Sequence, residues 1–129
     1  MRKPIILFLL LALWASVSAT ATQPRGKQLS ATARQMAQAG YVNVEDAVPG
    51  IHVSLMYSRP DNFTGRVLYT DLREAYLHPK AAAALAKAQR RLKQLRPGLS
   101  LKVYDAARPM HIQQKMWDAV KNTSKDIYV

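Results

Sequence analysis

The N-terminal segment determines how much of this chain has to fold. A basic pair at positions 2 and 3 precedes an apolar run from Ile5 to Val17, and small side chains follow at Ala19 and Ala21. This three-part pattern is typical of a secretory signal peptide. The apolar run is also shorter than the roughly 20 residues that a membrane-spanning helix needs. We therefore predict cleavage after Ala19 or Ala21 and an exported protein, periplasmic or extracellular; an uncleaved anchor is the alternative.

The composition of the remaining residues limits both the fold and the partners. The chain contains no cysteine, so stability has to come from a packed core of one small domain. The formal net charge is +11, and it falls to +9 without Arg2 and Lys3. A basic surface can favour nucleic acid, but export favours anionic envelope polymers or lipid headgroups. A solvated basic face without a dedicated partner is the alternative.

The clearest helical pattern extends from Pro79 to about Leu95. Proline suits the first turn of a helix, and Pro97-Gly98 is placed to stop it. An apolar stripe is formed by Ala81, Leu85, Ala88, Leu92 and Leu95. Most of the lysines and arginines fall off this stripe, which makes them the solvated side of an amphipathic helix. Nucleic acid is therefore not a predicted partner.

Shorter patterns complete a mixed layout of helices and strands. Ser30 and Gly40 bracket a short helix over 31–39. Residues 51–57 and 99–104 alternate in polarity as half-buried strands do, and 66–69 is a further strand candidate. A second amphipathic helix places Ile112, Met116, Trp117 and Val120 on one face. These patterns predict an α+β fold of helices and an antiparallel sheet.

Three segments carry a resemblance to a known family. They are MYSRPDNFTGRVLY at 56–69, AYLHPKAAAALAKAQ at 75–89 and LKVYDAARPMHIQQKMWDAV at 101–120. Together they resemble the zinc D-alanyl-D-alanine dipeptidases, the family that includes the vancomycin-resistance dipeptidases. The DNFTG loop and the YD-x-x-RP turn are the most specific parts. The residue patterns divide off a signal peptide at 1–21 and a flexible lead-in with a short helix at 22–40, and the resemblance makes 41–129 the N-terminal half of the catalytic domain.

The resemblance implies hydrolysis of D-Ala-D-Ala, a building block of bacterial cell-wall precursors, by a zinc-bound water. In that family the arginine of the YD-x-x-RP turn, here Arg108, stabilises the transition state. Arginine suits this role because it stays charged and offers a rigid fork of donors. Pro109 should hold Arg108 in an extended conformation. The alternative for Arg108 is a structural ion pair with Asp105.

The DNFTG loop supplies the other candidate site residues. In the family this loop lies near the substrate, so the resemblance makes Asp61 and Asn62 candidates for substrate binding. A turn that only holds Phe63 in the core is an equally good interpretation of the same residues.

The zinc ligands of the family are not evident in this sequence. A catalytic zinc takes three protein ligands and a water. The family supplies them from S-x-H-x-x-x-x-x-x-D and E-x-x-H motifs, which we expect beyond Val129. His52, His78 and His111 do not match these motifs, and Glu74 with His78 lacks a third ligand. We therefore predict zinc as the cofactor of the complete domain and no metal ligand in this chain.

Two functional hypotheses follow. The first is a truncated form of an exported zinc dipeptidase of cell-wall metabolism, with D-Ala-D-Ala as its substrate and no activity of this chain alone. The second is a catalytically inactive exported module that binds wall peptides or another chain. An unrelated basic envelope-binding protein would require the three matches to be accidental. We expect no stable membrane span after signal cleavage, and a half-domain with exposed apolar surface should self-associate.

Overall fold

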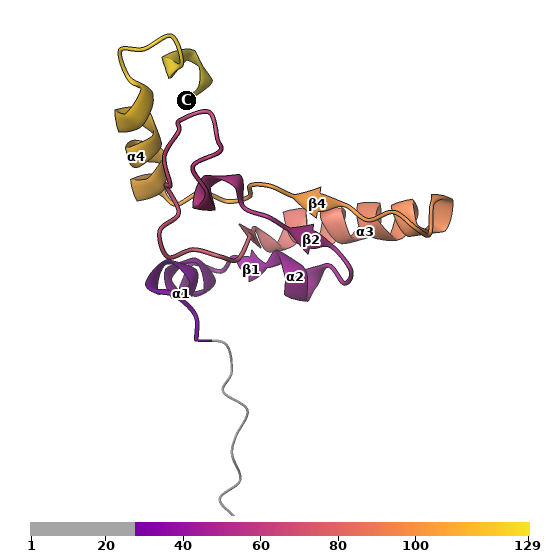
Figure 1. Ribbon diagram of the computed structural model, residues 1–129. Helices are drawn as coiled ribbons and strands as arrows, with labels where there is room; N and C mark the ends of the chain where they lie inside the picture. The colour runs from indigo at the N-terminus through magenta and orange to yellow at the C-terminus, as the bar shows by residue number, and fades with distance from the viewer. Residues whose placement is uncertain (1–27) are drawn as a thin grey trace, which may run out of the picture.

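A computed structural model describes residues 28–129, so the predicted signal peptide and residues 22–27 lie outside the described part. Short helices and strands alternate along the chain (Figure 1). They are α1 (Ala31–Gln38), β1 (Val42–Asn43), α2 (Val44–Ala47), β2 (His52–Val53), the 3-10 helix η1 (Met56–Ser58), β3 (Tyr76–Leu77), α3 (Pro79–Leu95), β4 (Lys102–Val103), α4 (Met110–Val120) and the 3-10 helix η2 (Asp126–Tyr128). The predicted α+β class is confirmed.

The strands form two separate pairs. β1 and β3 are antiparallel, with Val42 opposite Leu77. β2 and β4 are parallel, with His52 opposite Lys102, so the expectation of a purely antiparallel sheet is wrong for this pair. The reason is the connection, because α3 lies between the two strands and carries the chain back to the end where β2 began. Residues 66–69, predicted as a strand, form none; the Leu68 and Tyr69 amides instead both donate to the carbonyl of Tyr57.

The helix boundaries follow the predicted signals. The Ser30 hydroxyl accepts from the Ala33 amide at the start of α1, and Gly40 lies just beyond its end at φ +85°. That left-handed conformation is readily adopted by glycine. Pro79 occupies the first turn of α3, after His78, whose Nδ1 accepts from the Lys80 amide.

The buried face of α3 differs from the predicted stripe. Ala82, Ala86 and Gln89 are buried, whereas Ala81, Ala88 and Leu95 of the predicted stripe are exposed. The shift centres on the amide of Gln89, whose Nε2 donates to the Gly50 carbonyl (2.9 Å) and whose Oε1 accepts from the Leu101 amide (2.9 Å). A buried amide with these partners ties α3 to the chain around β2 and β4, which apolar periodicity does not reveal.

The core joins α1, α2 and α4 to the loop that leads into β3. Its most deeply buried large side chains are Tyr69, Leu72, Ile112, Met116, Val44, Val48 and Val120. α4 lies at one end of the molecule, and the C-terminal end of α3 extends away on the opposite side (Figure 1). No helix within 28–129 has the length and apolar character to cross a membrane.

Candidate functional site

Arg108 lies in the turn between β4 and α4. Its neighbour Pro109 is the N-cap of α4, with extended backbone angles of φ −60° and ψ 144°. The amide of Ala107 donates to the Tyr76 carbonyl of β3 at 2.8 Å. The turn is therefore fixed on one side by a strand and on the other by a helix start, which is a rigid mount for a side chain.

The guanidinium of Arg108 is held from several directions. Nη2 donates to Asp105 Oδ2 at 2.6 Å, and Nη1 donates to Gln113 Oε1 at 2.7 Å. Nη1 also approaches the sulfur of Met116 at 3.0 Å, and the guanidinium carbon lies 5.0 Å from the centre of the Tyr57 ring. The side chain is 22% exposed. The ion pair with Asp105 that the sequence left open therefore exists in the structure.

Asp105 connects Arg108 to the core. Its Oδ1 accepts a hydrogen bond of 2.6 Å from the hydroxyl of Tyr69, which is 1% exposed. Burial and the hydrogen bond to Asp105 raise the pKa of Tyr69 above its usual value, so the phenol stays a donor. Burial opposes the charge on Arg108, but hydrogen bonding to Asp105 and its negative charge outweigh this and raise the pKa of Arg108. Asp105 thus orients a permanently charged arginine.

The guanidinium of Arg108 has N–H groups that the contacts above do not use. An arginine carries five N–H groups, and the contacts above use Nη1 and one hydrogen of Nη2. Nε of Arg108 is buried and has no hydrogen-bond partner among residues 28–129. A buried donor without an acceptor is costly. Nε is therefore a donor of the charged group whose acceptor is missing among the described residues.

A chain of aromatic rings connects this site to the DNFTG loop. Tyr57 packs edge-on against Tyr69 at 5.9 Å and against Phe63 at 6.2 Å, and Phe63 packs in the same way against Tyr128. Because Tyr57 also lies against the guanidinium of Arg108, the loop and the arginine share one packed neighbour. The loop is thereby fixed to the site through Tyr57.

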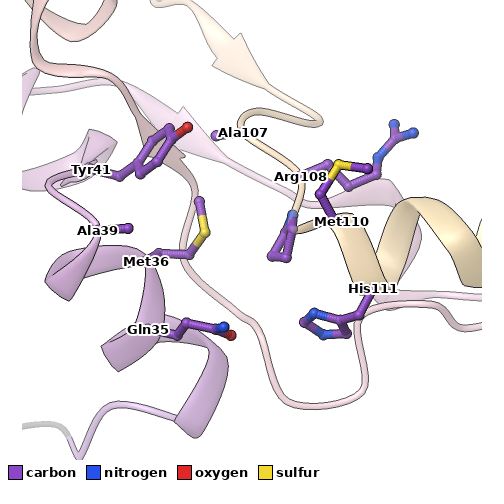
Figure 2. A pocket seen from close by; sticks show the side chains of 9 residues that line it. Gln35, Met36, Ala39, Tyr41, Ala107, Arg108, Met110 and His111 are labelled. Carbon is purple, nitrogen blue, oxygen red and sulfur yellow. The ribbon is translucent and has the colours of Figure 1, made fainter.

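Two hollows lie beside this turn. The larger has a volume of about 600 Å³ and is lined by Gln35, Met36, Ala39, Tyr41, Ala107, Arg108, Pro109, Met110 and His111. Figure 2 shows the guanidinium of Arg108 pointing away from Gln35 and Met36, so the charged group does not enter this hollow. The smaller hollow, about 240 Å³, is lined by Gln113, the hydrogen-bond partner of Arg108, together with Met110, Gln114, Trp117 and Val129. The larger volume therefore does not identify the hollow in which the Arg108 guanidinium would meet a substrate.

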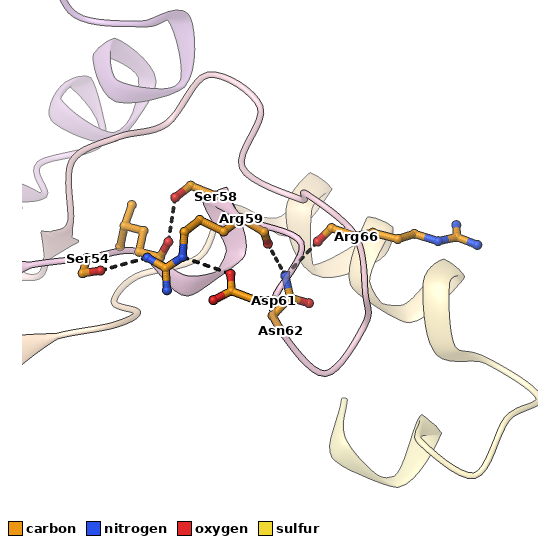
Figure 3. Close-up of polar contacts among 7 residues, drawn as sticks. Ser54, Ser58, Arg59, Asp61, Asn62 and Arg66 are labelled. Carbon is orange, nitrogen blue, oxygen red and sulfur yellow. Dashed lines mark hydrogen bonds and ion pairs between the residues drawn. The ribbon is translucent and has the colours of Figure 1, made fainter.

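Within the DNFTG loop, Asn62 closes the turn (Figure 3). Its Nδ2 donates to the carbonyls of Arg59 (2.6 Å) and Arg66 (2.8 Å). Its Oδ1 accepts from the amide (3.0 Å) and the hydroxyl (2.6 Å) of Thr64. These four bonds use the full capacity of the side chain. The structure therefore favours the turn interpretation for Asn62 over direct substrate contact.

Asp61 is placed differently from Asn62. Its carboxylate pairs with Arg59 Nε at 3.0 Å, and its side chain is 68% exposed. Arg59 also donates through Nη1 to the hydroxyl of Ser54 at 2.9 Å, as Figure 3 shows. An exposed carboxylate keeps free lone pairs, so Asp61 can still accept hydrogen bonds from a ligand.

Comparison with known proteins identifies the family. The model of the D-Ala-D-Ala dipeptidase family matches residues 37–129, which contain Arg108, the residues that contact it and the DNFTG loop. The chain belongs to the D-Ala-D-Ala dipeptidase family. It is also similar to the D-alanyl-D-alanine dipeptidase of Escherichia coli (strain K12), with 41% identity over 71 residues. That alignment covers 55% of this chain and 35% of the relative, so the match spans about a third of that protein's length. No solved structure gives a significant match.

The histidines do not form a metal site within the described residues of this family member. Across 28–129 no group of three or more histidine, aspartate, glutamate or cysteine side chains is placed to hold a metal ion. His78 caps α3, and Glu74 is buried beside the amide of Arg73 at 3.3 Å. These residues do not fit a catalytic zinc, which takes three protein ligands.

Several residues around Arg108 in this family member were not found from sequence. Tyr57, Tyr69, Gln113 and Met116 all lie within the segments that carry the family resemblance. Gln113 follows Arg108 by five residues, one turn into α4, so the helix start itself was a signal for its contact. The two tyrosines gave no such signal, because their contacts with Asp105 and Arg108 join distant parts of the sequence.

Proposed function

We propose that this chain supplies the transition-state arginine, Arg108, of an exported D-Ala-D-Ala dipeptidase of cell-wall metabolism. The observation that carries the proposal is the state of Arg108, which is charged, braced by Asp105 and Gln113, and left with a buried donor that lacks an acceptor. Membership of the dipeptidase family supplies the reaction class.

The role of Arg108 follows from its geometry. Attack of water on a peptide carbonyl places negative charge on the carbonyl oxygen, and a preorganised donor stabilises that charge. We assign this oxygen to the guanidinium of Arg108, whose Nε has no acceptor among residues 28–129. Asp105 and Gln113 hold the guanidinium still, so little reorganisation is needed as the charge develops. Asp105 and Gln113 are therefore positioning residues.

In this family a zinc ion, when bound, activates the attacking water. Residues 28–129 do not provide a ligand set for it. We propose that the metal-binding residues belong to the part of the family domain that this chain does not match, since the aligned stretch covers 35% of the relative. Residues 1–129 alone should then release no D-alanine from D-Ala-D-Ala, even with added zinc.

A chimera tests the proposed activity. Residues 37–129 of this chain would replace the corresponding part of the Escherichia coli relative, so that the relative supplies the rest of its domain. We expect zinc binding and release of D-alanine from D-Ala-D-Ala. A chimera that folds and binds zinc without hydrolysing the dipeptide would overturn the proposal and favour an inactive binding module.

Export is a separate proposal. It is supported by the pattern of the first 21 residues, with a basic start, a short apolar run and small residues at Ala19 and Ala21. Expression of the full chain in a bacterium, followed by fractionation and N-terminal sequencing, tests it. We expect a product that begins at Thr20 or Thr22 outside the cytoplasm; an uncleaved chain in the cytoplasm would contradict export.

Self-association of the chain is also proposed. Several large apolar side chains near the C-terminus are exposed, among them Met110 (80%), Ile127 (77%) and Tyr128 (70%). Apolar surface of this kind promotes association. Sedimentation velocity should show species larger than the monomer as concentration rises, whereas a monomer at all concentrations would refute this proposal.

A further inference from the structure

The basic charge of the chain is concentrated along and just after α3. Residues 79–104 contain seven lysines and arginines and no aspartate or glutamate, while the whole chain has a net charge of +11. These seven residues are Lys80, Lys87, Arg90, Arg91, Lys93, Arg96 and Lys102, and all are exposed. Four of them, Lys80, Lys87, Arg90 and Arg91, lie on one side of α3 at about 100° per residue, and these four are called the α3 basic face below.

The α3 basic face is not neutralised by the described part of the protein. The ion pairs within 28–129 join Arg59 to Asp61, Arg108 to Asp105, and Lys121 to Asp118. The polar contacts of α3 cations are to neutral groups, such as Arg91 to the Gln94 side chain and Lys93 to the Pro97 carbonyl. The positive potential of this face is therefore directed to solvent.

The end of α3 adds exposed apolar groups to this charge. Leu95 and Leu99 are each 55% exposed, and they flank Arg96 and the Pro97-Gly98 turn. A hydrogen bond of 3.0 Å from the Leu99 amide to the Arg96 carbonyl closes the turn. Figure 1 shows this tip extending away from the rest of the molecule, on the side opposite α4. The tip can therefore approach a flat surface without the Arg108 turn being covered.

We propose that the α3 basic face and the tip at 95–99 dock this protein onto an anionic phospholipid surface. Lysine and arginine near such a surface each contribute to binding, and apolar side chains that enter the headgroup region add to it. The two exposed leucines favour lipid over a soluble anionic polymer, because a polymer offers them no apolar layer. The inference concerns where the protein is held and does not depend on the dipeptidase proposal.

Vesicle binding tests the proposal with the full chain. Co-sedimentation would compare vesicles of equal parts phosphatidylglycerol and phosphatidylcholine with vesicles of phosphatidylcholine alone. The N-terminal apolar segment can enter both, so the readout is the ratio of the two partition coefficients. We expect a ratio well above one that falls as salt screens the charges. A ratio near one at low salt would overturn the proposal.

Matched variants locate the surface. The triple change Lys87→Gln, Arg90→Gln and Arg91→Gln removes three cations of the α3 basic face. Each cation raises the partition coefficient on anionic vesicles about fivefold, so the loss of three should lower the ratio of the two partition coefficients about a hundredfold. The control changes Arg66, Lys115 and Lys125 to glutamine, giving the same net charge, and should lower the ratio less than about fivefold. Equal losses in both triples would refute a docking face on α3.

The leucines distinguish a membrane from a polymer. The double change Leu95→Ser and Leu99→Ser should weaken binding to the anionic vesicles severalfold and leave binding to soluble polyglycerol phosphate unchanged. Polymer binding as tight as vesicle binding, together with no effect of the double change on vesicles, would assign the face to a polyanion and overturn the membrane proposal. Thermal melting of each variant checks that the fold is retained.

Discussion

Replacement of Asp105 is the most informative test of how the arginine is held. In Asp105→Ala, Arg108 loses its ion pair and the buried Tyr69 hydroxyl loses its acceptor. In Asp105→Asn, an amide oxygen still accepts from Tyr69, but the negative charge beside Arg108 is gone. The alanine variant should therefore be the less stable of the two.

The structure sets the size of the effect. The two side chains are 22% and 23% exposed, so the pair lies between surface pairs, worth at most about 1 kcal/mol, and buried pairs, whose breakage costs about 3–5 kcal/mol. We take about 2 kcal/mol for the pair and about 1 kcal/mol for the stranded hydroxyl of Tyr69. Asp105→Ala should thus lower the free energy of unfolding by about 3 kcal/mol, and Asp105→Asn by about 2 kcal/mol.

Urea unfolding followed by circular dichroism measures these differences, provided that the denaturant slope m stays constant. A double-mutant cycle of Asp105→Ala with Tyr69→Phe isolates the bond between the two side chains. Asp118→Ala, which removes an exposed partner of Lys121, is the control and should leave the midpoint unchanged. A loss below about 1 kcal/mol in Asp105→Ala would show that the carboxylate does not brace the site.

Three further predictions follow from individual contacts. The pKa of Tyr69 is raised in the folded protein, so this residue's contribution to stability is complete below about pH 10 and is lost as the pH rises further. Tyr69→Phe should therefore reduce the fall in the free energy of unfolding at alkaline pH. An equal fall in the variant and the parent would contradict this. Gln89→Leu strands the Leu101 amide and should cost about 2–3 kcal/mol in urea unfolding; a neutral result would show that the amide bonds do not tie α3 down. Asn62→Ala opens the loop and should increase its proteolysis, whereas Asp61→Ala should not; equal cleavage of both variants would refute the difference assigned to them.

Local signals predicted those parts of the fold that local chemistry controls. The start of α3 at Pro79 and its end before Pro97 depend on backbone restrictions of proline and glycine within a few residues. The cap at Ser30 and the placement of Arg108 between a strand and a helix are also local. Such features can be read from neighbouring residues alone.

The features that the sequence did not predict depend on contacts between residues far apart in the chain. The parallel pairing of β2 with β4 depends on the path that α3 takes, and the buried face of α3 depends on partners of Gln89 from two other segments. Likewise, Tyr57 and Tyr69 reach the Arg108 site through folding of the intervening chain. Alternation of polarity contains no information about such partners.

The central claim is that Arg108 stabilises the transition state of D-Ala-D-Ala hydrolysis. The direct measurement is the rate of D-alanine release, as kcat and KM, by the chimera carrying Arg108→Ala, with Arg66→Ala as the matched control. We predict that Arg108→Ala lowers kcat about 100-fold to 1000-fold while zinc binding and the control's kcat are retained. A kcat that stays within about threefold of the parent chimera, well short of the loss expected for a transition-state donor, would contradict the claim.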